Sequence, residues 1–323
     1  MIPIPVTQSL FRRLAELEGA ESALVLASGR AAVACTALAL LRPGDHLLAG
    51  SALRASTRAF FTHELPALGT EVTYVDPRQT RGWRRGLQRT TRALFVESPE
   101  VDSGRLVDLR PPRALANELG IALIVDATGA SPVNFTPLAH GADVVLHDAT
   151  AFIEPHGEGE VGIVAGTEGL VEEVRLKMKA WGAEPHPAAC AQLERGLATL
   201  EVRVHHQNNA AHQVAQWAST HPHVASVVYA GLPDHPDQPV LAEWFRGAGA
   251  LVLLQLPDGH DPARVGAHAT ARIQQGGGPK RVATRFLAHG EAGWLRVEVG
   301  LEPAEQLMDA LGAALSVTAS SPA

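Results

Sequence analysis

The sequence predicts an α/β protein, with a large domain built on a mostly parallel sheet and a smaller α+β domain after it. Short apolar runs of strand length alternate with helix-length segments, which is the pattern of repeated βαβ units. The composition is that of a globular protein, with 46% hydrophobic and 19% charged residues. At roughly 150 residues per domain, a chain of 323 residues favours two domains. We place them at residues 1–215 and 216–323.

The first elements follow from apolar runs and the residues that interrupt them. A helix is expected over residues 10–18 and ends at Gly19, and a strand is expected over residues 23–27. An alanine-rich helix then runs over about 30–41. The sequence Arg-Pro-Gly-Asp at 42–45 ends it, because proline and glycine break helices.

The rest of the large domain continues the alternation of strands and helices. Most of the strands are separated by segments of helix length, which predicts crossover connections between parallel strands. The further strand candidates are His46–Ala49, Glu71–Val75, Ala93–Glu97, Ala122–Asp126, Asp143–His147 and Val161–Ala165.

The pattern changes after a long helical stretch at about 168–218. Later strand candidates lie at 224–229, 250–256 and 295–299, and a helix at 303–315 closes the chain. This arrangement predicts the smaller α+β domain, with the boundary on a helical connection.

Charge and residue counts exclude several classes of function. The net charge is −7, so the broad positive field of a nucleic-acid-binding protein is absent. No apolar run approaches the roughly 20 residues that span a bilayer. With two cysteines, Cys35 and Cys190, the chain cannot build a disulfide framework, so we expect a cytoplasmic protein. The three lysines are Lys177, Lys179 and Lys280.

The histidines do not predict a metal site. His205, His206 and His212 share one expected helix, but the six-residue spacing of the last two does not place them on one face. No HExxH motif occurs.

Four expected strand ends carry polar residues that could face one crevice. They are Ser28-Gly29, Glu97-Ser98-Pro99, Asp126, and the run from His147 to Thr150. Ser28-Gly29 precedes a helix, whose N-terminus either suits a phosphate or is merely capped by Ser28. Asp126 could hold a protonated ring nitrogen, bind a metal, or cap the next helix.

The order and spacing of many segments resemble the Cys/Met-metabolism family of pyridoxal-phosphate (PLP) enzymes, which includes cystathionine γ-synthase and γ-lyase. The similarity covers residues 10 to 315 and implies the type I, aminotransferase-like fold. The segments that carry it are LEGAESALVLASGRAAVACTALALLRPGDHLLA, LGTEVTYVDP, ALFVESP, LGIALIVDATGASPV, PLAHGADVVLHDAT, RGLATLEVR, VVYAGLPDHP and LRVEVGLE.

The resemblance implies roles for five residues of this chain. Ser28 and Gly29 match the turn whose amides hold the cofactor phosphate, and Thr150 matches a phosphate-binding threonine. Asp126 matches the aspartate that keeps the pyridine nitrogen protonated. Arg296 matches the arginine that binds the substrate's α-carboxylate.

Four positions depart from the family's pattern. Ala151 stands where the family has the lysine that bonds the cofactor, and a methyl group cannot replace its chemistry. Asp148 replaces a serine that donates to the phosphate, and a carboxylate repels a phosphate. Arg54 replaces a tyrosine that stacks on the ring, and Val101 replaces an asparagine. The family's N-terminal arm is also not found.

These departures leave three candidate functions. The first is a catalytically silent homologue, and the second is an active PLP enzyme of sulfur amino-acid metabolism with atypical site residues. The third is a repurposed enzyme without PLP that uses Arg30, Arg54, Asp126 and Asp148 on another anion. The departures favour the first. By resemblance we also expect a homodimer, because family members associate as dimers.

Overall fold

The computed structural model describes residues 4–153, 160–275, 283–290 and 293–318. Contacts divide the chain into two compact units. The first comprises Met1–Val101 and Leu106–Leu200, and the second comprises Asp102–Arg105 and Glu201–Ala323. No helix in the described ranges has the length and apolar character needed to cross a bilayer.

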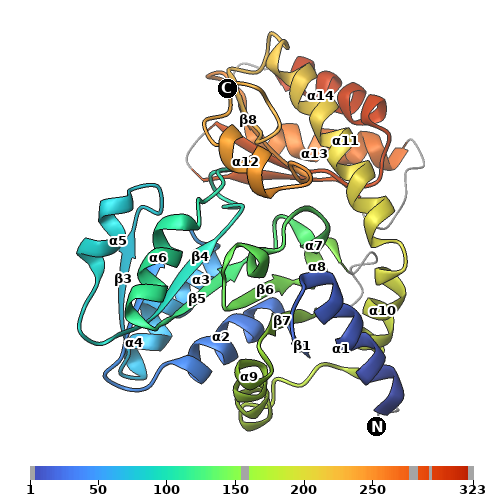
Figure 1. The fold of residues 1–323 in the computed structure, drawn as a ribbon. Helices are drawn as coiled ribbons and strands as arrows, with labels where there is room; N and C mark the ends of the chain where they lie inside the picture. The colour runs from blue at the N-terminus through green and yellow to red at the C-terminus, as the bar shows by residue number, and fades with distance from the viewer. Residues whose placement is uncertain (1–3, 154–159, 276–282, 291–292, 319–323) are drawn as a thin grey trace. The chain divides into compact units, whose positions relative to one another are not determined.

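The first unit is built on a seven-stranded sheet with the order β1-β7-β6-β5-β4-β2-β3 (Figure 1). The pairs β2–β3, β2–β4, β4–β5 and β5–β6 are parallel, whereas β7 runs antiparallel to both β1 and β6. The mostly parallel sheet is therefore confirmed, and each expected strand forms within two residues of its expected bounds. The strands are β1 (Ser22–Leu26), β2 (His46–Gly50), β3 (Glu71–Val75), β4 (Thr91–Glu97), β5 (Ala122–Asp126), β6 (Val144–Asp148) and β7 (Gly162–Gly166).

Local signals in the sequence explain where the helices of this unit begin and end. Ser28 caps α2, because its Oγ accepts a hydrogen bond from the backbone N–H of Ala31 at 3.1 Å. Gly120 ends α6 in the left-handed conformation, with φ of 62°. The helices are α1 (Ile4–Glu18), α2 (Gly29–Leu40), α3 (Ala55–Ala59), α4 (Leu65–Ala67), α5 (Thr80–Gly86), α6 (Arg110–Leu119), α7 (Ser131–Asn134), α8 (Ala149–Phe152), α9 (Glu168–Ala180) and α10 (Pro187–Leu197). A π-helical turn, η1 (Phe60–Glu64), joins α3 to α4, and a 3-10 turn, η2 (Pro137–His140), precedes β6.

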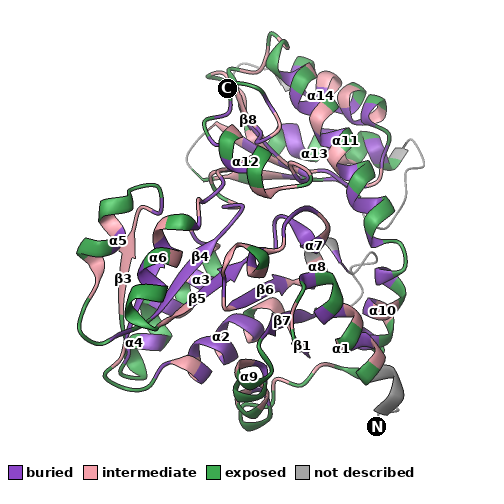
Figure 2. Ribbon diagram, in the orientation of Figure 1, coloured by how far each residue is buried: buried purple, intermediate pink, exposed green. Residues whose placement is uncertain are grey.

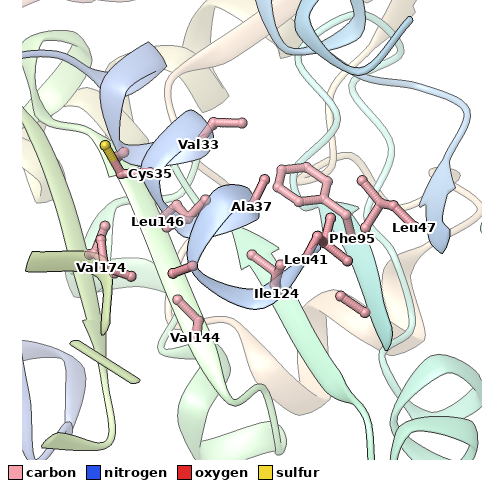
Figure 3. Packing of buried hydrophobic residues seen from close by; sticks show 14 of the residues in the cluster. Val33, Cys35, Ala37, Leu41, Leu47, Phe95, Ile124, Val144, Leu146 and Val174 are labelled. Atoms are coloured by element: carbon pink, nitrogen blue, oxygen red, sulfur yellow. The ribbon is translucent and has the colours of Figure 1, made fainter. Parts of the chain in front are cut away.

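The core of the first unit lies between α2 and the sheet. Small residues of α2, such as Ala37, pack over strand residues that include Phe95 and Ile124 (Figure 3). Phe95 also meets Phe61 edge to face, with 4.9 Å between the ring centroids. Figure 2 shows that the central strands are buried along their length, as expected for parallel strands covered by helices. This packing fixes the strand ends that carry the candidate site.

The second unit is built on a four-stranded antiparallel sheet with the order β10-β11-β9-β8. Its strands are β8 (Ser226–Val228), β9 (Leu251–Gln255), β10 (Arg285–His289) and β11 (Trp294–Glu298), and its helices are α11 (Leu200–Ser219), α12 (Gln238–Trp244), α13 (Pro262–Gln275) and α14 (Ala304–Thr318). The sequence did not predict β10, which is an edge strand with a single buried residue, Phe286, and so lacks a clear apolar alternation.

The expected division at residues 215/216 falls inside α11, whereas contacts divide the chain at Leu200. The reason is that α11 packs on the second sheet. The side-chain amide of Gln207 donates to the carbonyl oxygen of Val299 at 2.9 Å, and Asn208 accepts from the backbone of Gly249 at 3.2 Å.

Candidate functional site

The first unit brings the four expected strand ends to one edge of its sheet. Glu97 and Asp126 are register partners at the ends of β4 and β5. Asp148, at the end of β6, and Leu26, at the end of β1, both pair with Gly162 of β7. The polar groups that follow these strands therefore share one edge, as the βαβ pattern predicts.

The start of α2 lies against the end of β6. A methyl group added to Gly29 would lie 2.5 Å from the Cβ and 2.8 Å from the Cγ of Asp148, so only glycine fits there. The hydroxyl of Ser28 is engaged as the cap of α2. The side chain of Asp148 thus lies beside the first residue of α2, at the positive end of the helix dipole.

Arg54 connects two of the strand ends. Its Nη1 atom lies 3.6 Å from Oδ2 of Asp148, and its Nε atom lies 3.7 Å from Oε1 of Glu97. Its backbone N–H also donates to Oε2 of Glu97 at 2.9 Å. The guanidinium therefore lies between the carboxylates of β4 and β6.

Glu97 is the acidic group most strongly affected by these surroundings. Its side chain is 1% exposed. Burial, and after it the charge of Asp126, raises the pKa of the Glu97 carboxyl to about 8. Arg54 and the backbone N–H groups of Arg54 and Val101 act in the opposite direction. At neutral pH, Glu97 is therefore mostly protonated.

This shift makes the stability of the protein depend on pH. A carboxyl whose pKa is higher in the folded than in the unfolded state contributes stability that is present below about pH 4.5 and lost as the pH rises through about 8. We expect the melting temperature of the wild type to fall between pH 5 and pH 9. The melting temperature of the Glu97→Gln variant should fall less, and this variant should be the more stable protein at pH 9. The measurement is thermal unfolding across this range, with Glu305→Gln on the exposed face of α14 as the control. Parallel curves for the wild type and Glu97→Gln would contradict the assignment.

Asp126 and Asp148 are linked through Thr128, which the sequence did not single out. The hydroxyl of Thr128 donates to Oδ1 of Asp126 at 2.5 Å, and its backbone N–H donates to the same atom at 3.0 Å. The hydroxyl oxygen in turn accepts from the backbone N–H of Asp148 at 2.8 Å. Asp126 is thus buried and held in place at the strand edge, where a polar ligand would meet it.

Thr150 and Ala151 lie in α8, directly after Asp148. The backbone N–H of Thr150 donates to Oδ1 of Asp148 at 3.2 Å, and its hydroxyl oxygen accepts from the backbone of Val161 at 3.2 Å. Hydrogen bonds within the chain therefore already engage Thr150. Ala151 follows it in the same helical turn.

The lysines that the structure describes lie outside the strands and loops that form this edge of the sheet. Lys177 and Lys179 are in the last turn of α9, off its buried face of Val171, Val174 and Met178. Lys280 lies outside the described residues.

The two remaining predicted residues, Arg30 and Arg296, have other ion-pair partners. Arg30 is exposed on α2, with its Nη2 atom 3.5 Å from Oε2 of Glu160. Arg296 belongs to β11 of the second unit, where its Nε atom lies 3.2 Å from Oε1 of Glu298 and its Nη1 atom lies 3.8 Å from Oδ1 of Asp102. Arg296 is therefore already paired with carboxylates of its own unit.

Gly162 is a second residue that the sequence did not reveal. A methyl group added there would lie 2.2 Å from the carbonyl oxygen of Ser28. That oxygen accepts the first helical hydrogen bond of α2, from Ala32 at 3.0 Å. β7 therefore approaches this turn closely, and no pattern in the sequence signals such a long-range contact.

Residues 3–272 match the model of a protein family described as Cys/Met metabolism PLP-dependent enzyme. Cystathionine gamma-synthase 1, chloroplastic, from Arabidopsis thaliana is 35% identical over 253 residues, which are 78% of this chain and 45% of that protein. L-methionine gamma-lyase from Pseudomonas putida is 32% identical over 257 residues, which are 79% of this chain and 65% of that protein. The chain thus spans about half to two thirds of the length of these curated relatives.

Solved structures show the same similarity. The crystal structure of cystathionine gamma synthase from Xanthomonas oryzae pv. oryzae in complex with cystathionine superposes with a TM-score of 0.91 at 25% sequence identity. The match covers 99% of this chain and 87% of that one. The type I fold expected from the sequence is therefore confirmed.

Proposed function

The chain belongs to the Cys/Met metabolism family of PLP-dependent enzymes, and from this premise we propose that it is a catalytically silent member that keeps the fold. The observation that carries the proposal is Ala151, which stands in α8 directly after the end of β6 where the family's pattern has a lysine. A methyl group neither forms a bond to a carbonyl carbon nor transfers a proton. One side chain would supply both steps, so its loss is expected to lower turnover by many powers of ten.

The positions of the lysines in the chain support this proposal. The described ones, Lys177 and Lys179, lie in α9 and off its buried face. The ionisable groups at the strand ends are instead Arg54, Glu97, Asp126 and Asp148, none of which is a nucleophilic amine at neutral pH.

The residues around α2 do not fit PLP. Asp126 stands where a ring nitrogen would need a carboxylate, and PLP would supply an electron sink there if it were bound. However, the side chain of Asp148 lies against Gly29, at the helix start that a phosphate would need. Arg54 is engaged by Glu97 and Asp148. A phosphate dianion at this position would meet a carboxylate where it needs donors, so we derive no catalytic step through PLP.

The competing function is an active PLP enzyme with atypical site residues, and the named activities of the relatives favour it. Purified protein incubated with PLP separates the two functions. We expect no visible absorbance band of lysine-bound PLP and no protein-bound label after borohydride reduction. A stoichiometric reduced adduct on Lys177, Lys179 or Lys280 would favour the active enzyme instead.

We further propose that the chain forms a homodimer. We assign the contact between the two copies to the exposed side of α2 and η1. This side carries two apolar hollows of about 300 and 220 Å³, which share Ala31, Ala34 and Phe60. Trp181 and Leu68, which line the smaller one, are 62% and 40% exposed. Exposed apolar surface of this kind commonly marks an interaction site, and two-fold dimers are the commonest assemblies.

The dimer has a direct test. We expect light scattering to show twice the chain mass at micromolar concentration, and Trp181→Glu to shift the equilibrium towards monomer because it places a charge in an apolar contact. Leu119→Glu is the matched control, because Leu119 is 46% exposed on α6 and lies outside both hollows. A monomeric wild type at this concentration would refute the proposal.

A further inference from the structure

Two side chains that depart from the family's pattern contact each other across the candidate site. Arg54 precedes α3 and Asp148 ends β6, so they are far apart in the sequence, yet Nη1 of Arg54 lies 3.6 Å from Oδ2 of Asp148. Independent substitutions in a pocket that no longer binds a ligand would not be expected to place opposite charges in contact. Here the new anion and the new cation face each other.

We propose that Asp148 is a built-in anion that, paired with Arg54, takes the place of an external phosphate at the start of α2 and excludes phosphate-bearing ligands. The proposal rests on the function proposed above. It adds which group supplies the negative charge at the start of α2 when no cofactor phosphate is bound. Its first support is the position of Asp148, whose Cβ and Cγ would lie within 3 Å of a methyl group at Gly29. A carboxylate at a helix N-terminus interacts favourably with the helix dipole.

The second support is how firmly Asp148 is held. Its Oδ1 atom accepts from the backbone N–H of Thr150 at 3.2 Å, and its own N–H donates to the hydroxyl of Thr128 at 2.8 Å. Its other oxygen, Oδ2, faces Arg54. Both oxygens therefore have partners within the chain, so moving the carboxylate aside for a ligand would cost these contacts.

The third support is the local balance of charge. Arg54 also lies between Asp148 and Glu97, with 3.7 Å from its Nε to Oε1 of Glu97. Asp126 adds a further buried carboxylate beside Glu97. Since Glu97 is mostly protonated at neutral pH, the single positive charge of Arg54 is set against the carboxylates of Asp148 and Asp126. A phosphate dianion would add two negative charges to this acidic site.

Inorganic phosphate is the probe that tests this inference, with binding measured by calorimetry and by the shift in melting temperature at constant ionic strength. We expect no saturable binding to the wild type at millimolar phosphate. Asp148→Asn keeps the shape and removes the negative charge beside Arg54, so it should bind phosphate about tenfold more tightly than the wild type or better, as expected for one charge removed at roughly 4 Å. Adding Arg54→Gln to Asp148→Asn should abolish most of this gain, because the guanidinium of Arg54 is the cation that the phosphate would meet.

Asp309→Asn is the matched control, since it makes the same change of charge at an exposed position of α14 and should not alter phosphate binding. Asp148→Ser provides a second neutral variant if the asparagine variant does not fold. Equal phosphate affinity of the wild type and a folded neutral variant would overturn the inference, as would a gain that survives Arg54→Gln. Phosphate has no carbonyl group and cannot label a lysine, so this result is independent of the borohydride test of catalytic silence.

Discussion

We expect Gly162→Ala to lower the free energy of unfolding by about 3 kcal/mol or more, because the added methyl group would collide with backbone atoms. The methyl would lie 2.2 Å from the carbonyl oxygen and 2.6 Å from the carbonyl carbon of Ser28. A backbone carbonyl that already accepts the first helical bond of α2 cannot rotate away as a flexible side chain could. Either β7, all of whose residues are buried, or the first turn of α2 has to move.

Gly169→Ala is the matched control for this change. Gly169 lies in the first turn of α9, and no heavy atom lies within 4 Å of the methyl that the substitution would add. Alanine favours helix over glycine by up to about 1 kcal/mol, so this variant should be as stable as the wild type or slightly more stable. Urea denaturation of both variants measures the difference. A Gly162→Ala protein within about 0.5 kcal/mol of the wild type would show that β7 does not approach Ser28 this closely, since effects of that size are typical of surface substitutions.

The large sheet was predictable because buried parallel strands consist of short, nearly continuous apolar runs of sequence. Ala93–Glu97 and Ala122–Asp126 form as expected because such runs end at an acid or at a turn. Edge strand β10 was not predictable, because its sequence, RFLAH, holds an apolar run of only three residues and no apolar alternation. The position of the unit boundary depends on which sheet α11 packs against, and this is a long-range property that helix propensity does not contain.

The candidate site was predictable to the level of strand ends. The rule that ligand sites lie at the carboxyl ends of parallel strands placed Asp126 and Asp148 at the same edge from the sequence alone. The resemblance placed Arg54 and Asp148 in one pocket, but it did not predict the ion pair between them, because about ninety residues separate them and each replaces an uncharged residue of the family's pattern. Thr128 and Gly162 were missed because their roles come from a hydrogen bond and a close approach between separate elements.

We expect Ala151→Lys alone not to restore PLP binding. Asp148 would remain at the start of α2, where it opposes the phosphate, and it lies three residues before the new lysine. A carboxylate near an ammonium raises the pKa of that ammonium, so the new amine would stay protonated and unreactive. The missing lysine is therefore necessary for recovery but not sufficient.

Combining Ala151→Lys with Asp148→Ser should restore binding, because it returns the amine together with a neutral hydroxyl donor. Adding Arg54→Tyr gains ring stacking worth about 1 kcal/mol but removes the guanidinium expected to contact the phosphate, so the triple variant should bind PLP no more tightly than the double variant. The measurement is PLP titration of the three variants by visible absorbance, with Ala151→Lys plus Asp309→Ser as the control for the change of charge.

The order of affinities decides what prevents the wild type from using PLP. If the double variant binds PLP and the single variant does not, then Asp148 and the missing lysine block the cofactor separately. If Ala151→Lys alone binds as tightly as the triple variant, then Asp148 does not face the phosphate. The internal pair of Arg54 and Asp148 would then be an ordinary surface contact, because its partly exposed side chains would contribute little to the choice of ligand.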